Sequence, residues 1–285
     1  MTTNLLALET SGRSGSIALA KSTESLDGLR ESIGSEWSLP GRCLRNLTER
    51  LEILSLDLDP TWGSAKTLAP AIQKLLAQDG LAPKDLHAIA VVQGPGSFTG
   101  LRVGIATAKV MAYALQIPIL AIDTLEVIAQ QVSDSRTEPE SQSLDLFAVA
   151  DAFRGQSFWA KYRIGAGECV ETTRTRIDDN TWLAQELSAQ ELSVQDPSGC
   201  ICVAGPSLEK LRDCYREIPS AESQTALDKS KLVWEPKQLG EPRASTVARL
   251  GWRAWLRDQT VEPFGLLPMY YRSSAAEEKH SSGPS

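Results

Sequence analysis

Short apolar runs and amphipathic stretches follow one another along the chain. Residues 5–8 are apolar, residues 9–15 are polar with two glycines, and residues 16–20 are mostly apolar again. This order predicts two strands joined by a polar turn, which is a β-hairpin. Further on, residues 88–93 are apolar at every position but the last, and a helical pattern of small residues at 98–115 leads into the apolar run at 119–122. A strand, a helix and a second strand predict a βαβ unit with parallel strands.

The second half of the chain continues with strands and helices. Residues 144–164 show two strand patterns about a turn, and residues 201–211 show a strand, a tight turn and the start of a helix. Apolar residues recur at every third or fourth position over 247–255. This spacing predicts an amphipathic helix near the C-terminus, capped by Ser245 or Thr246.

One segment carries two incompatible patterns. Leucines at 44, 47, 51, 54 and 58 step by three and four as in a helix, whereas residues 54–59 alternate as in a strand. We favour a helix that ends before Pro60, because proline does not continue a helix. Residues 67–77 predict a further helix, with an apolar face that includes Leu68, Ile72 and Leu75.

The composition is that of a globular, mildly acidic chain. Of 285 residues, 42% are hydrophobic and 23% are charged, and the net charge is -7. A basic patch usually marks a phosphate-binding surface, so this chain alone is not expected to bind nucleic acid. No apolar run reaches the ~18 residues of a membrane span, and the N-terminus lacks a basic-then-apolar signal. We therefore expect a cytoplasmic protein without a membrane segment.

Histidines and cysteines limit the chemistry that the chain can perform. The two histidines, His87 and His280, are far apart in the sequence. A histidine-based hydrolytic triad or an H-E-x-x-H zinc motif is therefore not expected. Five cysteines show no framework spacing, and we expect the side chains of Cys200 and Cys202 to alternate between the faces of a strand. The prediction is buried free thiols and no metal site.

The stretch "QGPGSFTGLR" at 93–102 is the main candidate for ligand chemistry. It lies between a strand and a helix, where backbone N–H groups and the helix dipole favour an anion. It lacks the G-K-[ST] of a Walker loop, and its G-x-G-x-x-x-G spacing differs from the dinucleotide-binding G-x-G-x-x-G. Two interpretations stay open: an anion-binding loop, or glycines that serve backbone angles and close packing.

Several blocks resemble one known family. "LLALETSGRSGSIALA", "AIAVVQGPGSFTGLRVGIATAKVMAYALQIPILAIDTLEVIA", "VADAFRGQSFWAKY" and the closing "LPMYYR" are similar to successive blocks of the TsaB (YeaZ) family. The resemblance implies an α/β, actin-like and ribonuclease-H-like (ASKHA) fold of two lobes, each a mixed sheet with flanking helices. It implies a first lobe at 1–122 with a returning C-terminal helix at 243–272, and a second lobe at 123–242. Residues 273–285 are small and charged, and we expect a disordered tail.

The TsaB family belongs to the bacterial machinery that makes threonylcarbamoyladenosine beside the anticodon of transfer RNA. The resemblance implies a non-catalytic scaffold subunit with no cofactor or metal, which pairs with the catalytic paralogue TsaD and works with the ATPase TsaE. Transfer RNA would be met only through that complex, and a homodimer is an alternative pairing of the same helices. The expected partner-contact residues are Leu68, Ile72, Leu75, Arg102, Ala106, Lys109 and Val110. The expected residues of a vestigial nucleotide or anion loop are Glu9, Thr10, Ser11, Gly94, Gly96, Ser97 and Gly100.

One departure from the family bears on nucleotide binding. Family members commonly carry Asp-Thr-Ser after the first strand, and this chain carries Glu9-Thr10-Ser11. The extra methylene moves the carboxylate and weakens a role in binding a nucleotide's metal ion. Asp151, near the first strand of the second lobe, is interpreted as a turn residue. The alternative function, an active actin-like ATPase or small-molecule kinase, needs a competent metal carboxylate, for which Glu9 and Asp151 are weak candidates.

Overall fold

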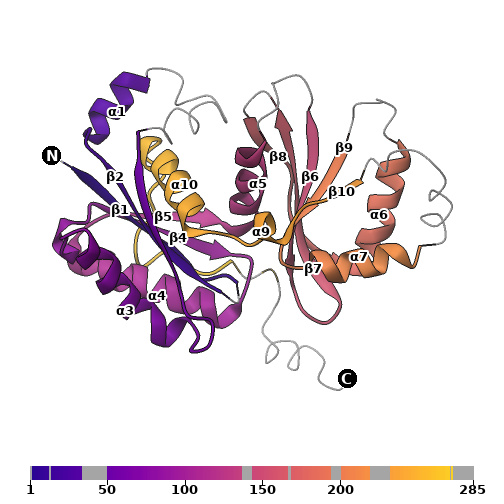
Figure 1. Cartoon of the computed structure of the whole chain (residues 1–285), viewed down its shortest axis with the longest axis horizontal. Helices are drawn as coiled ribbons and strands as arrows, with labels where there is room; N and C mark the ends of the chain where they lie inside the picture. Colours follow the sequence, from indigo (N-terminus) through magenta and orange to yellow (C-terminus); the bar gives the residue numbers. More distant parts are fainter. Residues whose placement is uncertain are drawn as a thin grey trace, which may run out of the picture.

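The computed structural model contains two five-stranded sheets that lie side by side, one in each lobe of the molecule (Figure 1). It describes residues 2–12, 14–33, 50–136, 143–165, 168–193, 200–218, 232–269 and 271. The predicted disordered tail at 273–285 lies outside these residues. Helices cover both faces of the sheets, so the predicted α/β fold of two mixed sheets with flanking helices is confirmed. In this part of the chain, no helix is long and apolar enough to cross a membrane.

The first sheet has the strand order β3-β2-β1-β4-β5. Its strands are β1 (Thr3–Glu9), β2 (Ser16–Ser22), β3 (Glu52–Asp57), β4 (Ala88–Gly94) and β5 (Ile119–Asp123). β1 and β2 form the predicted antiparallel hairpin, and β4 and β5 run parallel to β1, as the predicted βαβ unit requires. The middle residues of β1, β2, β4 and β5 are mostly apolar, as expected for strands that helices bury from both sides of the sheet.

Strand β3 corrects the helix that we favoured for the leucine-rich segment. Residues 52–57 pair antiparallel with β2, with Leu54 opposite Leu19. Leu54 and Leu56 face one core of the lobe while Ile53 faces the other, so the alternating pattern prevails over the helical one. The prediction failed because Leu54 and Leu58 fit both the helical stripe and the alternation of residues 54–59, and only the pairing with β2 decides between them. Residues 44–49 of the predicted helix lie outside the described residues.

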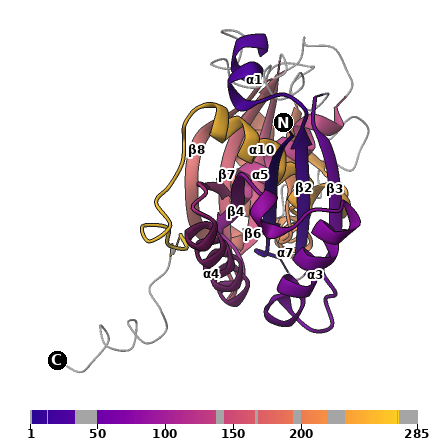
Figure 2. The same ribbon diagram turned by 90° about the vertical axis from the view of Figure 1, so that its left-hand side faces the viewer.

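Helices cover the first sheet differently on its two faces. α3 (Ser64–Gln78) and α4 (Phe98–Leu115) lie next to each other on one face, as Figure 2 shows. α1 (Leu26–Ile33) and α10 (Ala244–Leu256) cover the other face. The predicted cap of α10 at Ser245 or Thr246 is wrong, because the helix already begins at Ala244. A side chain outside the helix provides a hydrogen-bond acceptor for its first residue, since the Ala244 N–H donates to the Ser16 hydroxyl at 2.9 Å.

The second sheet repeats the arrangement of the first. Its order is β10-β9-β6-β7-β8, with β7 and β8 antiparallel to their neighbours and β9 and β10 parallel to β6. Its strands are β6 (Leu144–Asp151), β7 (Gln156–Gly165), β8 (Glu168–Asp179), β9 (Cys200–Ala204) and β10 (Leu232–Trp234). The helices of this half are α5 (Thr124–Ser135), α6 (Asn180–Ser193), α7 (Leu208–Arg216) and α9 (Lys237–Gly240), and a short 3₁₀ turn, η2 (Pro83–Asp85), precedes β4 in the first half. The two sheets therefore share one strand order, as two similar lobes require.

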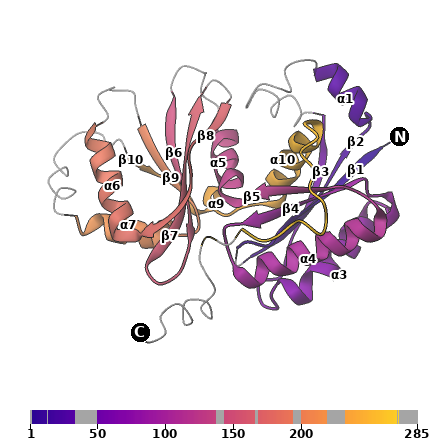
Figure 3. The same cartoon turned by 180° about the vertical axis from the view of Figure 1, so that it is seen from behind.

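The lobes exchange the helix that follows each sheet. α5 follows the first sheet but packs on the second one, whereas α10 follows the second sheet and packs on the first, as seen from behind in Figure 3. Charged side chains join these two helices: Arg249 contacts Asp134 at 3.0 Å, and Arg253 pairs with Glu126. From this packing we propose the division that the sequence predicted, with 1–122 and 243–272 in one lobe and 123–242 in the other.

Candidate functional site

The stretch at 93–102, which we call the glycine loop, packs directly against the turn that follows β1. Ser97, the N-cap residue of α4, donates its backbone N–H to the Ser11 carbonyl at 2.7 Å. The Ser97 hydroxyl accepts from the Gly100 N–H at 3.3 Å, and the Ser97 carbonyl accepts from the Leu101 N–H at 2.9 Å. Two of the N–H groups that an anion could use at this helix start, those of Ser97 and Gly100, therefore already have acceptors within the chain.

The glycines of this loop are explained by lack of space. A Cβ atom at Gly100 would overlap the carbonyl oxygen of Thr10, and one at Gly96 would lie 2.7 Å from the Ser11 carbonyl oxygen. Gly94 adopts a φ of 126°, which side chains of L-residues disfavour. The close-packing interpretation is confirmed for these positions. The structure thus brings the predicted loop residues together, while a nucleotide or anion role for them stays a prediction.

Glu9, the last residue of β1, points into the protein. Its side chain is fully buried, and one carboxyl oxygen accepts from the Ser11 N–H at 2.7 Å and from the Ser11 hydroxyl at 2.5 Å. Burial raises the pKa of Glu9 to about 7, although the hydrogen bonds from Ser11 lower it. The second carboxyl oxygen has no hydrogen-bond partner. Glu9 is therefore poised between a neutral and a charged form near neutral pH.

Asp151 occupies the matching position at the end of β6, in the second lobe. One of its carboxyl oxygens accepts from the Phe153 N–H at 3.0 Å, and the other binds Lys210 at 2.6 Å. The first contact stabilises the turn between β6 and β7, so the interpretation of Asp151 as a turn residue is confirmed.

Three of the predicted partner-contact residues lie inside the first lobe. Leu68, Ile72 and Leu75 on α3 are at most 5% exposed and pack in the core between this helix and the sheet. Their assignment to a docking surface is therefore wrong. The helical pattern marked their shared apolar face correctly, but that face covers the chain's own sheet. The sequence pattern alone does not distinguish a core face from an interface.

α4 carries a second apolar face that points away from the sheet. Phe98, Arg102, Ala106, Val110 and Tyr113 are all exposed and follow one another at spacings of three and four. Val110 is 69% exposed and Tyr113 is 59% exposed. The guanidinium of Arg102 stacks over the Phe98 ring, 3.7 Å from its centroid. We call these five residues the α4 outer face.

Lys109 has a different role from its predicted neighbours on this helix. Its ammonium donates to the carbonyl oxygens of Leu266 at 3.1 Å and Phe264 at 3.4 Å. The Phe264 ring packs edge-on against Tyr113, with 5.3 Å between the ring centroids. Lys109 therefore holds the chain's own C-terminal segment beside α4, and that segment extends the α4 outer face with exposed Phe264 and Leu267.

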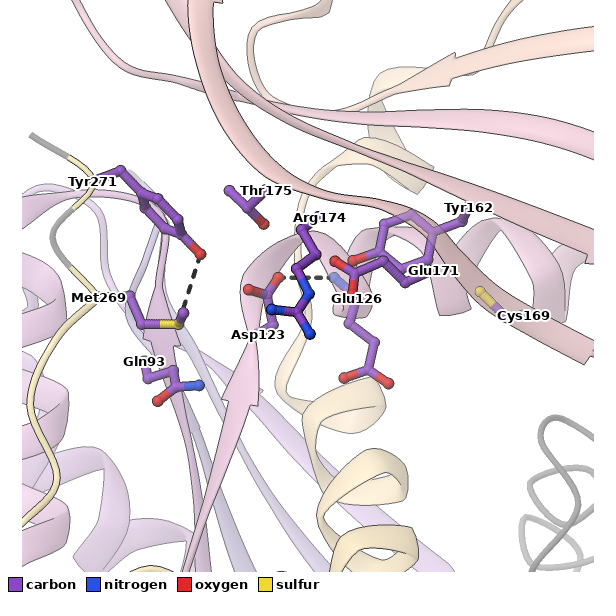
Figure 4. Close-up of a pocket in the computed structure, with 10 residues that line it drawn as sticks. All are labelled: Gln93, Asp123, Glu126, Tyr162, Cys169, Glu171, Arg174, Thr175, Met269 and Tyr271. Atoms are coloured by element: carbon purple, nitrogen blue, oxygen red, sulfur yellow. Dashed lines mark hydrogen bonds between the residues drawn. The ribbon is translucent and has the colours of Figure 1, made fainter.

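A cavity of about 530 Å³ lies where the two lobes meet (Figure 4). Side chains from β5, β7, β8, the start of α5 and the C-terminal segment line it. Burial raises the pKa of Asp123 to about 7, and burial together with the neighbouring Glu126 carboxylate raises the pKa of Glu171. Among the residues that line this cavity, three carboxyl groups face one guanidinium, that of Arg174. This charge balance is unsuited to a phosphate group.

Comparisons with known proteins identify the family. A family model described as TsaD, tRNA N6-adenosine threonylcarbamoyltransferase, matches residues 63–218. The tRNA threonylcarbamoyladenosine biosynthesis protein TsaB of Escherichia coli (strain K12) is 32% identical over 218 residues, which are 74% of this chain and 82% of that protein. This chain belongs to the TsaB family. The Bacillus subtilis (strain 168) TsaB is 29% identical over 220 residues, 74% of this chain and 80% of that protein.

Solved structures support the fold of this TsaB-family chain. YeaZ from Pseudomonas aeruginosa covers 94% of this chain and 99% of its own length, with a TM-score of 0.62 and 23% sequence identity. A second structure, described as an uncharacterized protein with similarity to peptidase YeaZ from Pseudomonas aeruginosa, has a TM-score of 0.64 and 24% identity. It covers 95% of this chain and all of its own length. Both agree with the two-lobed architecture.

Within the described residues of the TsaB-family chain, no three histidine, cysteine, aspartate or glutamate side chains form a group that could hold a metal ion. Glu9 and Asp151, the two strand-end carboxylates, each have partners of their own. Neither carboxylate is presented for metal coordination.

Several residues of these sites were not predicted from the sequence. The cavity residues Asp123, Tyr162 and Glu171 come from strands of the two different sheets, and their approach depends on how the sheets are placed together. Phe98 and Tyr113 carried a usable signal, because they continue the spacing of Arg102, Ala106 and Val110 on one helix face. Arg102, Ala106 and Val110 of this face were predicted, whereas the two aromatic residues were missed because the prediction rested on the small side chains of the helix.

Proposed function

We propose that this chain is a non-catalytic scaffold subunit of the complex that installs threonylcarbamoyladenosine on transfer RNA. In this proposal the chain docks on the catalytic paralogue TsaD, works with the ATPase TsaE and meets transfer RNA only through the complex. The family of the chain supports the pathway, since its relatives in Escherichia coli and Bacillus subtilis are named for the biosynthesis of this nucleoside.

The observation that carries the docking part is the α4 outer face. A helix buried on one side by Leu101, Ile105 and Ala108 needs no apolar residues on its other side, yet Val110 and Tyr113 are exposed there. Exposed apolar patches of this kind mark protein–protein contacts more often than scattered single residues do. Ala106 lies in the middle of the face, where a small side chain lets a partner helix approach to about 8–10 Å.

The strand-end carboxylates support the scaffold role rather than catalysis. An actin-like ATPase places carboxylates of this kind at a bound nucleotide and its metal ion. Here Glu9 is fully buried and bonded to Ser11, and Asp151 is engaged by Lys210 and the turn. An ATPase or kinase would first have to release both groups from these partners.

The test is to place a large side chain at the centre of the α4 outer face. Ala106→Trp should leave the circular dichroism spectrum unchanged, because Ala106 is exposed and touches no core. The variant should lose co-elution with TsaD and reduce threonylcarbamoyladenosine formation at least tenfold in a reconstitution with TsaD, TsaE, transfer RNA and the synthase-derived adenylate. Its matched control is Ala189→Trp, which makes the same change at an exposed position of α6 in the second lobe.

Co-elution of Ala106→Trp with TsaD at wild-type strength would remove α4 as the docking helix. Equal loss in Ala189→Trp would show a general effect of added tryptophan. If the chain alone forms a homodimer that Ala106→Trp disrupts, the same face serves self-association. Steady ATP hydrolysis by the purified chain without TsaD would contradict the scaffold role and favour the ATPase alternative.

A further inference from the structure

Two cysteines share one face of β9 at the edge of the second lobe. Cys200 and Cys202 are its first and third residues, so their side chains point to the same side, toward α5. Our expectation that they alternate between faces is wrong, since alternation places Ile201 on the opposite side and not Cys202. The two sulfur atoms are 3.8 Å apart. Cys202 is fully buried, whereas Cys200 is partly exposed.

A fixed cation lies beside this dithiol. Arg136, which ends α5, places its Nη2 atom 3.1 Å from the Cys202 sulfur and forms an ion pair with Glu235. The Glu235 side chain is only 8% exposed, which holds the guanidinium in place. The charged or titratable groups that act on Cys200 are Cys202 on its own strand, Arg136 from α5 and Glu235 after β10.

This arrangement favours a thiolate at Cys200. The hydrogen bond between the two sulfur atoms lowers the pKa of Cys200 to about 7, with burial opposing and Arg136 assisting. The pKa of Cys202 is raised, because it holds the shared proton and is buried. Cys169 shows the contrast within the same molecule, since burial raises its pKa to about 12. A thiolate, not a thiol, is the nucleophilic form of cysteine.

We propose that Cys200 and Cys202 form a reactive dithiol in which Cys200 undergoes thiol–disulfide exchange with small-molecule disulfides. The Cys200 thiolate attacks one sulfur of the disulfide, the S–S bond breaks, and the other half leaves as a thiolate. The product is a mixed disulfide at Cys200, and the small molecule has been reduced by one thiol equivalent. Arg136 and the Cys202 S–H stabilise the attacking thiolate and do not change during the step.

Closure to a Cys200–Cys202 disulfide is the slower second step. There the Cys202 thiolate would attack the Cys200 sulfur and expel the second small thiol. Residues two apart on a strand are separated by about 6.6 Å between Cα atoms. That separation is at the upper end of the range for disulfides, roughly 4.4–6.8 Å. The mixed disulfide at Cys200 should therefore accumulate.

The test uses 4,4′-dithiodipyridine with the full chain in a Cys43→Ser background, because Cys43 lies outside the described residues. Stopped-flow absorbance measures thiopyridone release between pH 5 and 9, and peptide mapping locates the modified sulfur. We expect one fast phase that maps to Cys200 and whose rate rises with an inflection near pH 7. At pH 7 the rate should exceed that of an ordinary thiol only about threefold, because the lower pKa also reduces nucleophilicity. The position of the inflection is therefore the sharper readout.

Matched variants separate this proposal from general thiol exposure. Cys200→Ser should abolish the fast phase, and Cys214→Ser should leave it unchanged. Cys202→Ala and Arg136→Gln should keep the reaction at Cys200 but move its inflection toward the ordinary value of about 8.5. A fast phase that persists in Cys200→Ser, or a Cys200 inflection that none of these variants moves, would overturn the proposal.

Discussion

The two lobes share a strand order but treat the end of their first strand in opposite ways. β1 ends in Glu9 and β6 ends in Asp151, and each is the central strand of its sheet: β1 lies between β2 and β4, and β6 between β7 and β9. Glu9 is fully buried, whereas the side chain of Asp151 is 28% exposed and forms an ion pair with Lys210. The topology thus provides two equivalent carboxylate positions, and local packing decides the chemistry of each.

The loop after the fourth strand shows what the lobes have in common. In the first lobe, α4 starts against Thr10 and Ser11, with Gly100 at the closest approach. In the second lobe, Gly205 follows β9, with a φ of 146° and its Cα against the carbonyl group of Val149 in β6. Each lobe therefore needs a glycine where this loop meets the first strand. The lobes differ in charge at the strand end, and not in this contact.

Adding a single methyl group at these two contacts should have the largest effect on stability. Gly100→Ala and Gly205→Ala would each place a Cβ atom on a backbone carbonyl that cannot move without distorting a strand or its turn. We expect each to lower the free energy of unfolding by about 3 kcal/mol. Urea denaturation, monitored by circular dichroism, measures this change in the free energy of unfolding.

Gly155→Ala is the control for this pair. Gly155 also has a positive φ, 77°, but no atom lies within 4 Å of the added methyl group. Backbone strain alone should cost about 1 kcal/mol there. If Gly100→Ala unfolds like the wild type, the close approach of α4 to the Glu9 turn is not a packing requirement and the likeness of the two lobes fails at this point.

Glu9→Gln should change the dependence of stability on pH. The pKa of Glu9 is about 7 in the folded protein against 4.5 as the ordinary value, so the folded state binds the proton more tightly. The stabilisation that protonated Glu9 contributes is present in full below pH 4.5. It is lost as the pH rises through 7, which lowers the free energy of unfolding by on the order of 3 kcal/mol. The neutral amide removes this loss, so the free energy of unfolding of the variant should rise relative to that of the wild type between pH 5 and pH 8.

The difference between the two stability curves isolates Glu9. Asp123, whose pKa is also about 7, contributes a slope of the same sign to both proteins. Parallel curves for wild type and Glu9→Gln from pH 5 to pH 8 would mean that the folded protein holds Glu9 no more protonated than the unfolded chain does.

Asp151→Asn should have the smallest effect. The amide oxygen can still accept from the Phe153 N–H, so only the pair with Lys210 is lost, and Lys210 is 58% exposed. Exposed ion pairs contribute little, and we expect about 0.5 kcal/mol in thermal or urea denaturation. A loss above about 2 kcal/mol would contradict the contrast between the lobes, since it would give the exposed carboxylate the weight of a buried one.

The hairpin, the βαβ unit and the strand pair after residue 143 could be predicted because their patterns are local. Residues 88–93 are apolar at every position but the last, and turn residues bound them on both sides, which leaves one interpretation. Residues 52–57 could not be assigned in this way. Their period was decided by pairing with β2, more than thirty residues earlier in the chain.

The candidate sites were harder to predict than the elements that carry them. Gly100 was recognised as a notable residue of the loop. The contact that requires a glycine there was not predicted, because Thr10 approaches it only in the folded chain. Leu75 and Val110 are both apolar residues on neighbouring helices, and one is buried while the other is exposed. Which face of a helix meets the sheet is set by the whole lobe, so residue type alone cannot assign a surface.

The exchange of α5 and α10 has a consequence for the order in which the chain is made. Residues of β1 leave the ribosome first, yet the helix that covers one of their faces ends at Leu256. At 5–20 residues per second, the alanines and leucines of that face wait roughly ten to fifty seconds for their cover. Meanwhile β6 to β9 can already assemble around α5. The lobe whose strands are translated first is therefore the last to receive its covering helix, and one face of its nascent sheet stays apolar and uncovered in the meantime.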